Sequence, residues 1–124
     1  MRLLADTHAA LWLLGEDKRL SARADELLTD PANEILLSAA VVWEVAIKRS
    51  LGKLDAPDGF ARQLLDGGAV SLPISIDHAR AVHSLPWHHR DPFDRLLVAQ
   101  ATLEDAVLVS SDERLRRYGV GVSW

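Results

Sequence analysis

The sequence predicts an α/β fold in which two layers of helices enclose a central, mostly parallel sheet of four to five strands. Short apolar runs alternate with helical patterns, as in a doubly wound sheet. These runs are continuously apolar, which is typical of parallel strands buried on both faces. The chain has 124 residues, of which 48% are hydrophobic and 26% charged. This length and balance suit one domain over residues 1–124, and no linker or internal repeat divides it.

The first part of the chain predicts two strands, each followed by a helix. The first strand covers residues 3–5, and the helix after it covers 6–14. A second helix over 21–30 precedes the second strand at 34–37 and a long helix at 38–51. The second and third helices begin at a serine, which is a favoured N-cap, and a glycine follows the third helix.

The middle of the chain predicts two helices around a short strand. A helix over 57–66 ends at a glycine pair, and residues 70–72 form a weak strand before a proline. A serine opens the next helix, over 75–85, and residues 86–90 form a loop.

The last part predicts one long helix and two further strands. The helix over 91–104 has proline at its first position, where proline is favoured. A strand at 106–110 leads into a short helix over 112–119 that ends at a glycine, and 120–124 form a last edge strand.

The composition excludes several classes of site. The chain contains no cysteine, so it forms no disulfide and no thiolate zinc site. A net charge of −4 argues against a generic nucleic-acid binder, although a metal bound to clustered carboxylates would bias that count. The apolar stretch 3–14 is too short to span a bilayer, and no secretory signal is visible. We therefore expect a cytoplasmic protein that makes no membrane contact.

Four acidic residues lie beside or within apolar segments that are far apart in the sequence: Asp6, Glu44, Asp94 and Asp112. Asp6 and Asp112 follow expected strands, and ligands of such sheets bind beyond the carboxyl ends of the strands. Glu44 is the only charge in the stretch 39–47. Buried carboxylates are costly unless they are paired or bound to a metal. Four of them converging would form an oxygen-ligand site for Mg²⁺ or Mn²⁺.

Each acid also has a simpler interpretation. Asp6 and Asp112 could cap the helices that follow them. Asp94 could lie in the first turn of a helix capped by Asp91, where the helix dipole favours negative charge. Glu44 could form an exposed pair with Lys48, four residues later. The apolar flanks of Glu44 favour burial instead.

Other chemical signals are weak. Adjacent histidines such as His88 and His89 are more often exposed than zinc-bound, and His8 could touch a phosphate or simply pack. Ser110 and Ser111 lack a legible Ser-His-Asp arrangement. No phosphate-binding or dinucleotide-binding glycine motif is present.

The chain resembles the PIN-domain ribonucleases, specifically the VapC-type toxins of bacterial toxin–antitoxin pairs. The matching segments, in the expected order, are LLADTHAALWLL at 3–14, LSAAVVWEVAIK at 37–48, HRDPFDRLLVAQA at 89–101 and LVSSD at 108–112, with LGKL at 51–54 adding to the match. The resemblance implies that Asp6, Glu44, Asp94 and Asp112 hold Mg²⁺ or Mn²⁺. It also implies that Thr7 and Ser111 are supporting polar residues.

This resemblance implies a metal-dependent endoribonuclease that acts as a toxin. RNA would approach along basic residues near the site, for which the candidates are Lys48, Arg90, Arg95 and Arg114. The resemblance further implies a homodimer and a VapB-like antitoxin partner. The antitoxin would block the acidic site with an arginine and would carry the DNA-binding function, so no direct DNA binding is expected of this chain.

Three other classes are weighed against this interpretation. A catalytically silent PIN-type binding module is disfavoured because all four acids are present. A receiver-like signalling domain would need paired acids after the first strand and a central phosphoacceptor aspartate, which the sequence lacks. A haloacid-dehalogenase-type phosphatase would need a second aspartate two positions after Asp6, where His8 stands.

Overall fold

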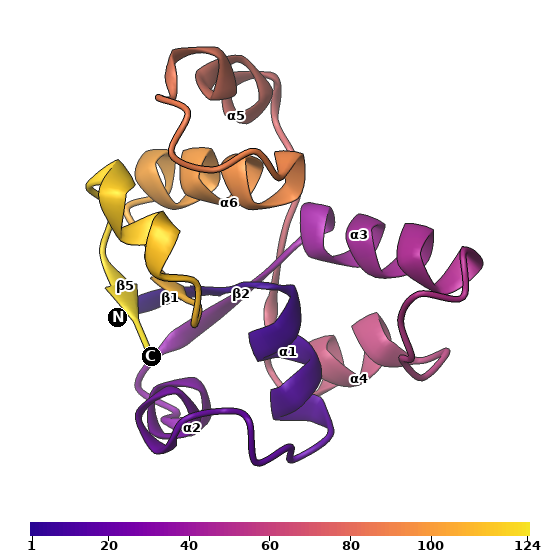
Figure 1. Cartoon of the computed structure of the whole chain (residues 1–124). Helices are drawn as coiled ribbons and strands as arrows, with labels where there is room; N and C mark the ends of the chain where they lie inside the picture. Colours follow the sequence, from indigo (N-terminus) through magenta and orange to yellow (C-terminus); the bar gives the residue numbers. More distant parts are fainter.

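The computed structural model describes residues 1–124 and contains a five-stranded sheet in the order β3-β2-β1-β4-β5 (Figure 1). The strands are β1 (Arg2–Ala5), β2 (Glu34–Ser38), β3 (Val70–Leu72), β4 (Val107–Val109) and β5 (Val122–Ser123). All four neighbouring pairs are parallel. The predicted α/β class and parallel sheet are confirmed, and the sheet has the larger of the expected strand numbers.

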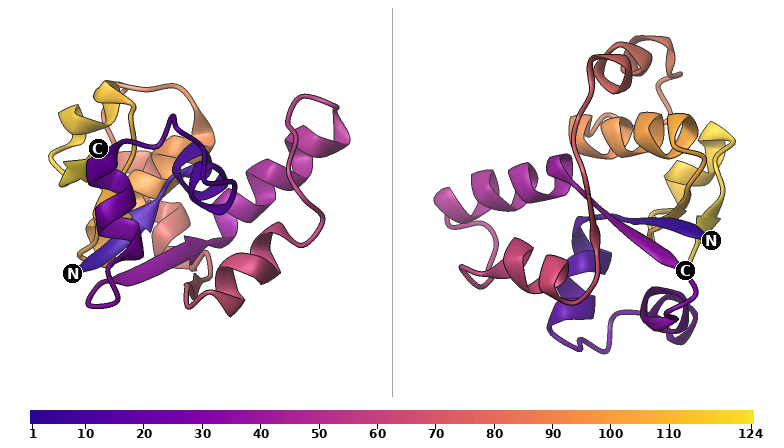
Figure 2. Two further views of the ribbon diagram at one scale, coloured as in Figure 1. Left: turned by 90° about the horizontal axis from the view of Figure 1, so that it is seen from below. Right: turned by 180° about the vertical axis from the view of Figure 1, so that it is seen from behind.

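Helices cover both faces of the sheet. They are α1 (Thr7–Leu14), α2 (Ala22–Thr29), α3 (Ala39–Ser50), α4 (Phe60–Asp66), α5 (Ile76–Ala81) and α6 (Pro92–Leu103), with the 3₁₀ segments η1 (Val82–Ser84) and η2 (Glu113–Tyr118). Figure 2 shows α5 and α6 on one side of the sheet and α1, α2 and α4 on the other. The helix α3 extends from the carboxyl edge of the sheet and contacts both α1 and α6. None of the helices is long and apolar enough to cross a membrane.

The core explains why the strands are continuous apolar runs. Leu3, Leu4, Leu36, Leu108 and Val109 are almost completely buried, since helices pack on both sides of the central strands. Burying a side chain of this size contributes roughly 1.5–3 kcal/mol. These strands therefore hold the sheet in place and fix where their carboxyl ends lie.

Local chain chemistry places the helix starts as expected. The side chains of Asp6, Ser21, Ser38, Ser75 and Asp91 each accept a hydrogen bond from a backbone N–H of the helix that follows. Such caps satisfy donors that the first helical turn leaves free.

Three helices differ from the sequence expectation. The helix expected from Pro57 begins at Phe60, because the N–H of Phe60 closes a turn onto the carbonyl of Pro57. The helix expected over 75–85 changes to 3₁₀ at Val82, where carbonyls of the segment accept hydrogen bonds from the Arg95 guanidinium. The segment after Asp112 is also 3₁₀, and it ends at Gly119 with a φ of 79°.

The order of the strands creates a topological switch point at the carboxyl edge of the sheet. β1 and β4 are neighbours, yet the chain leaves them toward different elements, α1 after β1 and η2 after β4. Ligands of doubly wound sheets bind at such a switch point, outside the carboxyl ends of the strands. Asp6 and Asp112 follow these two strand ends.

A buried polar network joins α3 to α6. The Ser38 hydroxyl, at the start of α3, donates to Gln100 Oε1 on α6 over 2.5 Å. Gln100 Nε2 lies 3.3 Å from both the Pro73 carbonyl and His78 Nδ1. Because Ser38 and Gln100 are fully buried, these bonds set how the two helices sit relative to each other.

Replacing Gln100 with leucine should therefore destabilise the fold. The substitution leaves the Ser38 hydroxyl and the Pro73 carbonyl without this partner, at a cost of about 1–3 kcal/mol. Denaturant unfolding measures the loss. Gln63→Leu, on the exposed surface of α4, is the matched control and should change stability by less than about 0.5 kcal/mol. Equal stabilities of the two variants would show that the network does not hold the helices.

Candidate metal centre

Asp6 is both a helix cap and a buried acid. Its Oδ1 accepts a hydrogen bond from the Ala9 N–H over 2.9 Å, and the residue is only 8% exposed. Burial raises the pKa of Asp6, while hydrogen bonds from Ser110 and Ala9 and the nearby His8 lower it in part. Both interpretations of Asp6, as a helix cap and as a buried acid, are therefore correct.

Glu44 is buried on α3 and faces α1. The residue is 5% exposed, and its Oε1 accepts a hydrogen bond of 2.5 Å from the Thr7 hydroxyl. Its Oε2 lies 2.5 Å from Lys48 Nζ. The pairing with Lys48 exists, but it belongs to a buried carboxylate rather than to an exposed surface pair. Thr7, one of the two expected supporting residues, therefore contacts one of the four acids.

Asp94 lies in the first turn of α6. Asp91 caps this helix through bonds of 2.8 and 3.1 Å from the N–H groups of Phe93 and Asp94. The pKa of Asp94 is raised to about 7, mainly by burial and then by the charge of Asp91, with smaller contributions from Asp6 and Glu44 and an opposing one from His89. Asp94 therefore shares one electrostatic environment with Asp6 and Glu44.

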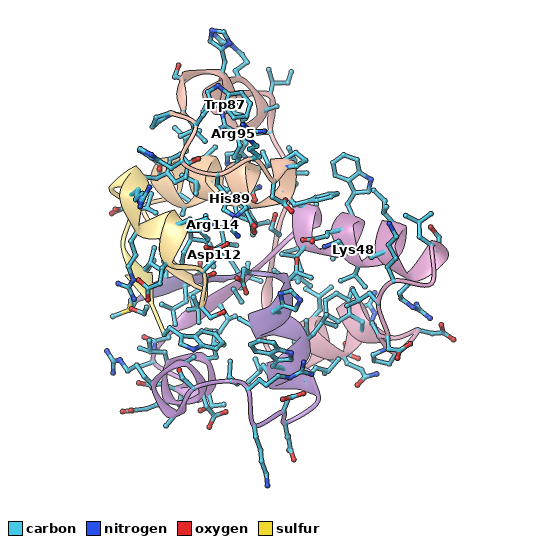
Figure 3. The ribbon with its side chains drawn as sticks, in the orientation of Figure 1. Lys48, Trp87, His89, Arg95, Asp112 and Arg114 are labelled. Atoms are coloured by element: carbon cyan, nitrogen blue, oxygen red, sulfur yellow. The ribbon has the colours of Figure 1, made fainter.

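Asp112 follows β4 and is surrounded by donors. Its Oδ1 accepts from the backbone N–H and from Nε of Arg114, both over 3.0 Å. Its Oδ2 lies 2.8 Å from Arg114 Nη2 and 2.8 Å from His89 Nε2. The hydrogen bonds from Arg114, and then the one from His89, lower the pKa of Asp112 to about 2. Figure 3 shows His89, Asp112 and Arg114 side by side.

His89 is the residue of this site that the sequence did not reveal. The expectation that it is exposed is wrong, because it is only 5% exposed. Its Nε2 lies 3.2 Å from Asp94 Oδ2 as well as 2.8 Å from Asp112 Oδ2. Ligand atoms of these three residues all lie within 4.8 Å of one another. The His89 backbone N–H donates to the hydroxyl of Tyr118, 29 residues later, and no local pattern in a loop signals such a contact.

Two further expectations need correction. Arg95 is 3% exposed, and its guanidinium donates to the carbonyls of Pro86, Val82 and Leu85 while it stacks 3.9 Å from the Trp87 ring. This burial is incompatible with the expected RNA contact. Ser111 is exposed, whereas the neighbouring Ser110 is buried, accepts from the Asp112 N–H and lowers the pKa of Asp6. Ser110, rather than the expected Ser111, therefore contacts the acids Asp6 and Asp112.

The other basic candidates differ in their surroundings. Lys48 is paired with Glu44, and Arg114 binds both carboxylate oxygens of Asp112. Arg90 is exposed, next to His89. Two of the candidate cations therefore already neutralise acids of the site.

The residues present fit a hard divalent cation. The donor set consists of carboxylate oxygens, which suit Mg²⁺ and Mn²⁺. Asp6 and Asp94 are largely buried, and no lysine or arginine forms an ion pair with either of them. A cation at this position would offset the burial that raises the pKa of both groups.

Comparison with known proteins places the chain in a family. The sequence model of the PIN domain matches residues 3–121. The chain belongs to the PIN domain family. One relative of this PIN domain is Ribonuclease VapC16 of Mycobacterium tuberculosis, which is 42% identical over 59 residues. That alignment covers 46% of this chain and 42% of the relative, so it spans less than half of either protein.

Solved structures share the fold of this PIN domain. VapBC2 from Rickettsia felis, bound to a DNA fragment from its promoter, aligns with a TM-score of 0.72 over 99% of this chain and 98% of that chain, at 17% identity. VapBC-1 from nontypeable Haemophilus influenzae aligns with a TM-score of 0.69 over 99% and 97% of the two chains, at 16% identity. At such low identity the likeness establishes the fold alone.

The raised pKa of Asp94 predicts how the stability of the metal-free protein depends on pH. The folded state holds this proton up to about pH 7, whereas the unfolded chain releases it near its ordinary pKa of 3.8. Stability should therefore increase as the pH falls between these values, by at most about 2 kcal/mol from about pH 7.5 to about pH 5.5. Thermal unfolding in EDTA measures this gain.

Asp94→Asn is the control for that measurement, because it removes the titrating group and should lose most of the gain. Asp112 has a lowered pKa, so its own effect on stability occurs below about pH 4, outside the pH range of this measurement. Parallel pH profiles for the wild type and Asp94→Asn would contradict the prediction.

Proposed function

We propose that this PIN domain is a Mg²⁺- or Mn²⁺-dependent endoribonuclease that acts as the toxin of a toxin–antitoxin pair. The observations that carry the proposal are the electrostatic coupling of Asp94 to Asp6 and Glu44 and the contacts of His89 Nε2 with both Asp94 and Asp112. The partial match to a ribonuclease of the VapC type supports the choice of RNA as substrate. The match of the family model to residues 3–121 supports the prediction of one PIN-like domain over residues 1–124.

The four acids would hold the cation through their carboxylate oxygens. A bound divalent cation lowers the pKa of a water molecule and neutralises charge that builds on the phosphate oxygens. The chain itself fixes the ligands: the Ala9 N–H orients Asp6, the Thr7 hydroxyl orients Glu44, and His89 joins Asp94 to Asp112. Hydrogen bonds of this kind to metal ligands strongly affect metal affinity.

The cations at the rim would receive the RNA. Lys48 and Arg114 lie beside the acids, and Arg90 is exposed next to His89. Their positive charge would attract the phosphate backbone, an interaction that weakens with salt. Arg95 is no longer a candidate because its guanidinium is buried.

The proposed toxin function also implies protein partners. We propose a VapB-like antitoxin that covers the acidic site and carries the DNA-binding function, and a homodimer of this chain. The similar solved structures are VapBC complexes, and that of Rickettsia felis contains promoter DNA, which supports the antitoxin partner. The cytoplasmic location stays a prediction. The alternative, a silent PIN-type binding module, is disfavoured because all four acids are retained.

The proposal predicts that Asp6→Asn abolishes cleavage without unfolding the protein. Asparagine is as good an N-cap as aspartate, so α1 keeps its start while the site loses one charged ligand. Cleavage of labelled RNA in Mg²⁺ or Mn²⁺ should fall by at least about a hundredfold. Asp25→Asn, in the exposed first turn of α2, is the matched control and should cleave normally. Full wild-type activity in excess EDTA would refute the metal-dependent nuclease.

Glu44→Gln tests whether this buried acid acts through its charge. Glutamine keeps the size of the side chain and an oxygen that accepts from Thr7, so the protein should fold. Removing the charge should reduce RNA cleavage by at least about a hundredfold and weaken Mn²⁺ binding. Glu26→Gln, on the exposed surface of α2, is the control. If Glu44→Gln cleaves RNA like the wild type, the site consists of the three aspartates alone.

A further inference from the structure

The loop before α6 holds His89 in a single orientation. The backbone N–H of His89 donates to the Tyr118 hydroxyl over 2.9 Å, and its carbonyl lies 3.5 Å from Arg95 Nη1. On the ring, Nδ1 accepts a hydrogen bond of 3.0 Å from the Asp91 N–H. Because the residue is also buried, its imidazole is held by contacts on both the backbone and the ring.

These contacts determine which ring nitrogen carries the proton. A backbone N–H can only donate, so Nδ1 of His89 uses its lone pair to accept from Asp91. The ring proton of the neutral imidazole is then on Nε2. This nitrogen lies 2.8 Å from Asp112 Oδ2 and 3.2 Å from Asp94 Oδ2. One N–H group therefore points at both carboxylates.

The same contacts exclude His89 as a metal ligand in this arrangement. Binding a cation through Nε2 would require its lone pair, so the ring proton would have to move to Nδ1. There it would point at the N–H of Asp91, 3.0 Å away, and two donors would face each other. His89 is a donor to the acids and not a member of the ligand set.

Asp112 depends on this donor for its link to Asp94. Arg114, which is largely exposed, binds both oxygens of Asp112 from the solvent side. The contact between the two acids runs through His89 Nε2, which touches one oxygen of each. Without this donor, the repulsion between like charges and the pull of Arg114 would both move Asp112 away from Asp94.

We propose that His89 is a positioning residue, whose Nε2–H holds Asp94 and Asp112 at the separation that one divalent cation requires. The inference rests on the proposed metal-dependent function and adds a residue to its site. Histidine is needed at this position because its two nitrogens accept from the loop and donate to the acids at the same time.

Two amide substitutions separate this role from a merely structural one. In His89→Gln the side-chain amide reaches the region of the imidazole Nε2 and can still donate to both acids. In His89→Asn the amide is one methylene shorter and reaches only the region of Nδ1. The readout is the Mn²⁺ dissociation constant of the full chain, from the free-Mn²⁺ signal in electron paramagnetic resonance. His83→Asn, at an exposed position, is the control.

His89→Asn should weaken Mn²⁺ binding by about tenfold or more, and His89→Gln should stay within about threefold of the wild type. Wild-type affinity in both variants would overturn the proposal. The proposal would also be overturned if both variants lost Mn²⁺ affinity equally and the wild type showed a nitrogen coupling to Mn²⁺. That combination would identify His89 as a ligand. If the wild type binds no Mn²⁺, or if Asp6→Asn binds Mn²⁺ as tightly as the wild type, then the proposed metal site is wrong. The proposed role of His89 would then be wrong as well.

A second measurement needs neither metal nor a substitution. The ¹⁵N signals of the His89 ring in the metal-free protein should show a proton on Nε2 and none on Nδ1. A proton on Nδ1 would overturn the proposal, even if His89→Asn fails to fold.

Discussion

The burial of carboxylates at the carboxyl edge of the sheet is the constraint on which this structure depends. Burying an ionised acid is costly, and each acid here is compensated by a different partner. Asp6 accepts a hydrogen bond from the first turn of α1. Glu44 is paired with Lys48 and accepts a hydrogen bond from Thr7, and Asp112 is paired with Arg114. Asp94 is the least compensated, with a pKa of about 7. Of the four acids, Asp94 would therefore gain the most from a bound cation.

The fold supplies this edge through strand order and helix packing. The neighbouring strands β1 and β4 place Asp6 and Asp112 after adjacent strand ends, although 106 positions of sequence number separate them. Glu44 and Asp94 come from α3 and α6, whose relative position depends on the buried bond between Ser38 and Gln100. The site therefore depends on the core, since a shift between the two helices would separate acids that no direct bond connects.

Local chemistry made much of this structure predictable. A serine or an aspartate marked the helix starts, because capping involves only residues a few positions apart. Glu44 was predictable because a single charge interrupts an apolar helix. The surroundings of His89, Arg95 and Ser110 were not predictable. Their burial arises from contacts between segments distant in sequence, such as the one between His89 and Tyr118, and loop residues carry no periodic pattern that reports such contacts.

The balance of charge at the site explains why the net charge of −4 says little about nucleic-acid binding. The four acids and the nearby Asp91 face two paired cations, Lys48 and Arg114, so the metal-free site is negative and would repel a phosphate. A divalent cation would remove most of that excess, and it would compete with Lys48 and Arg114 for carboxylate oxygens that they now bind. Under the proposed function, cation binding would favour RNA binding in two ways, because it would neutralise the acids and would leave Lys48 and Arg114 less strongly paired at the rim.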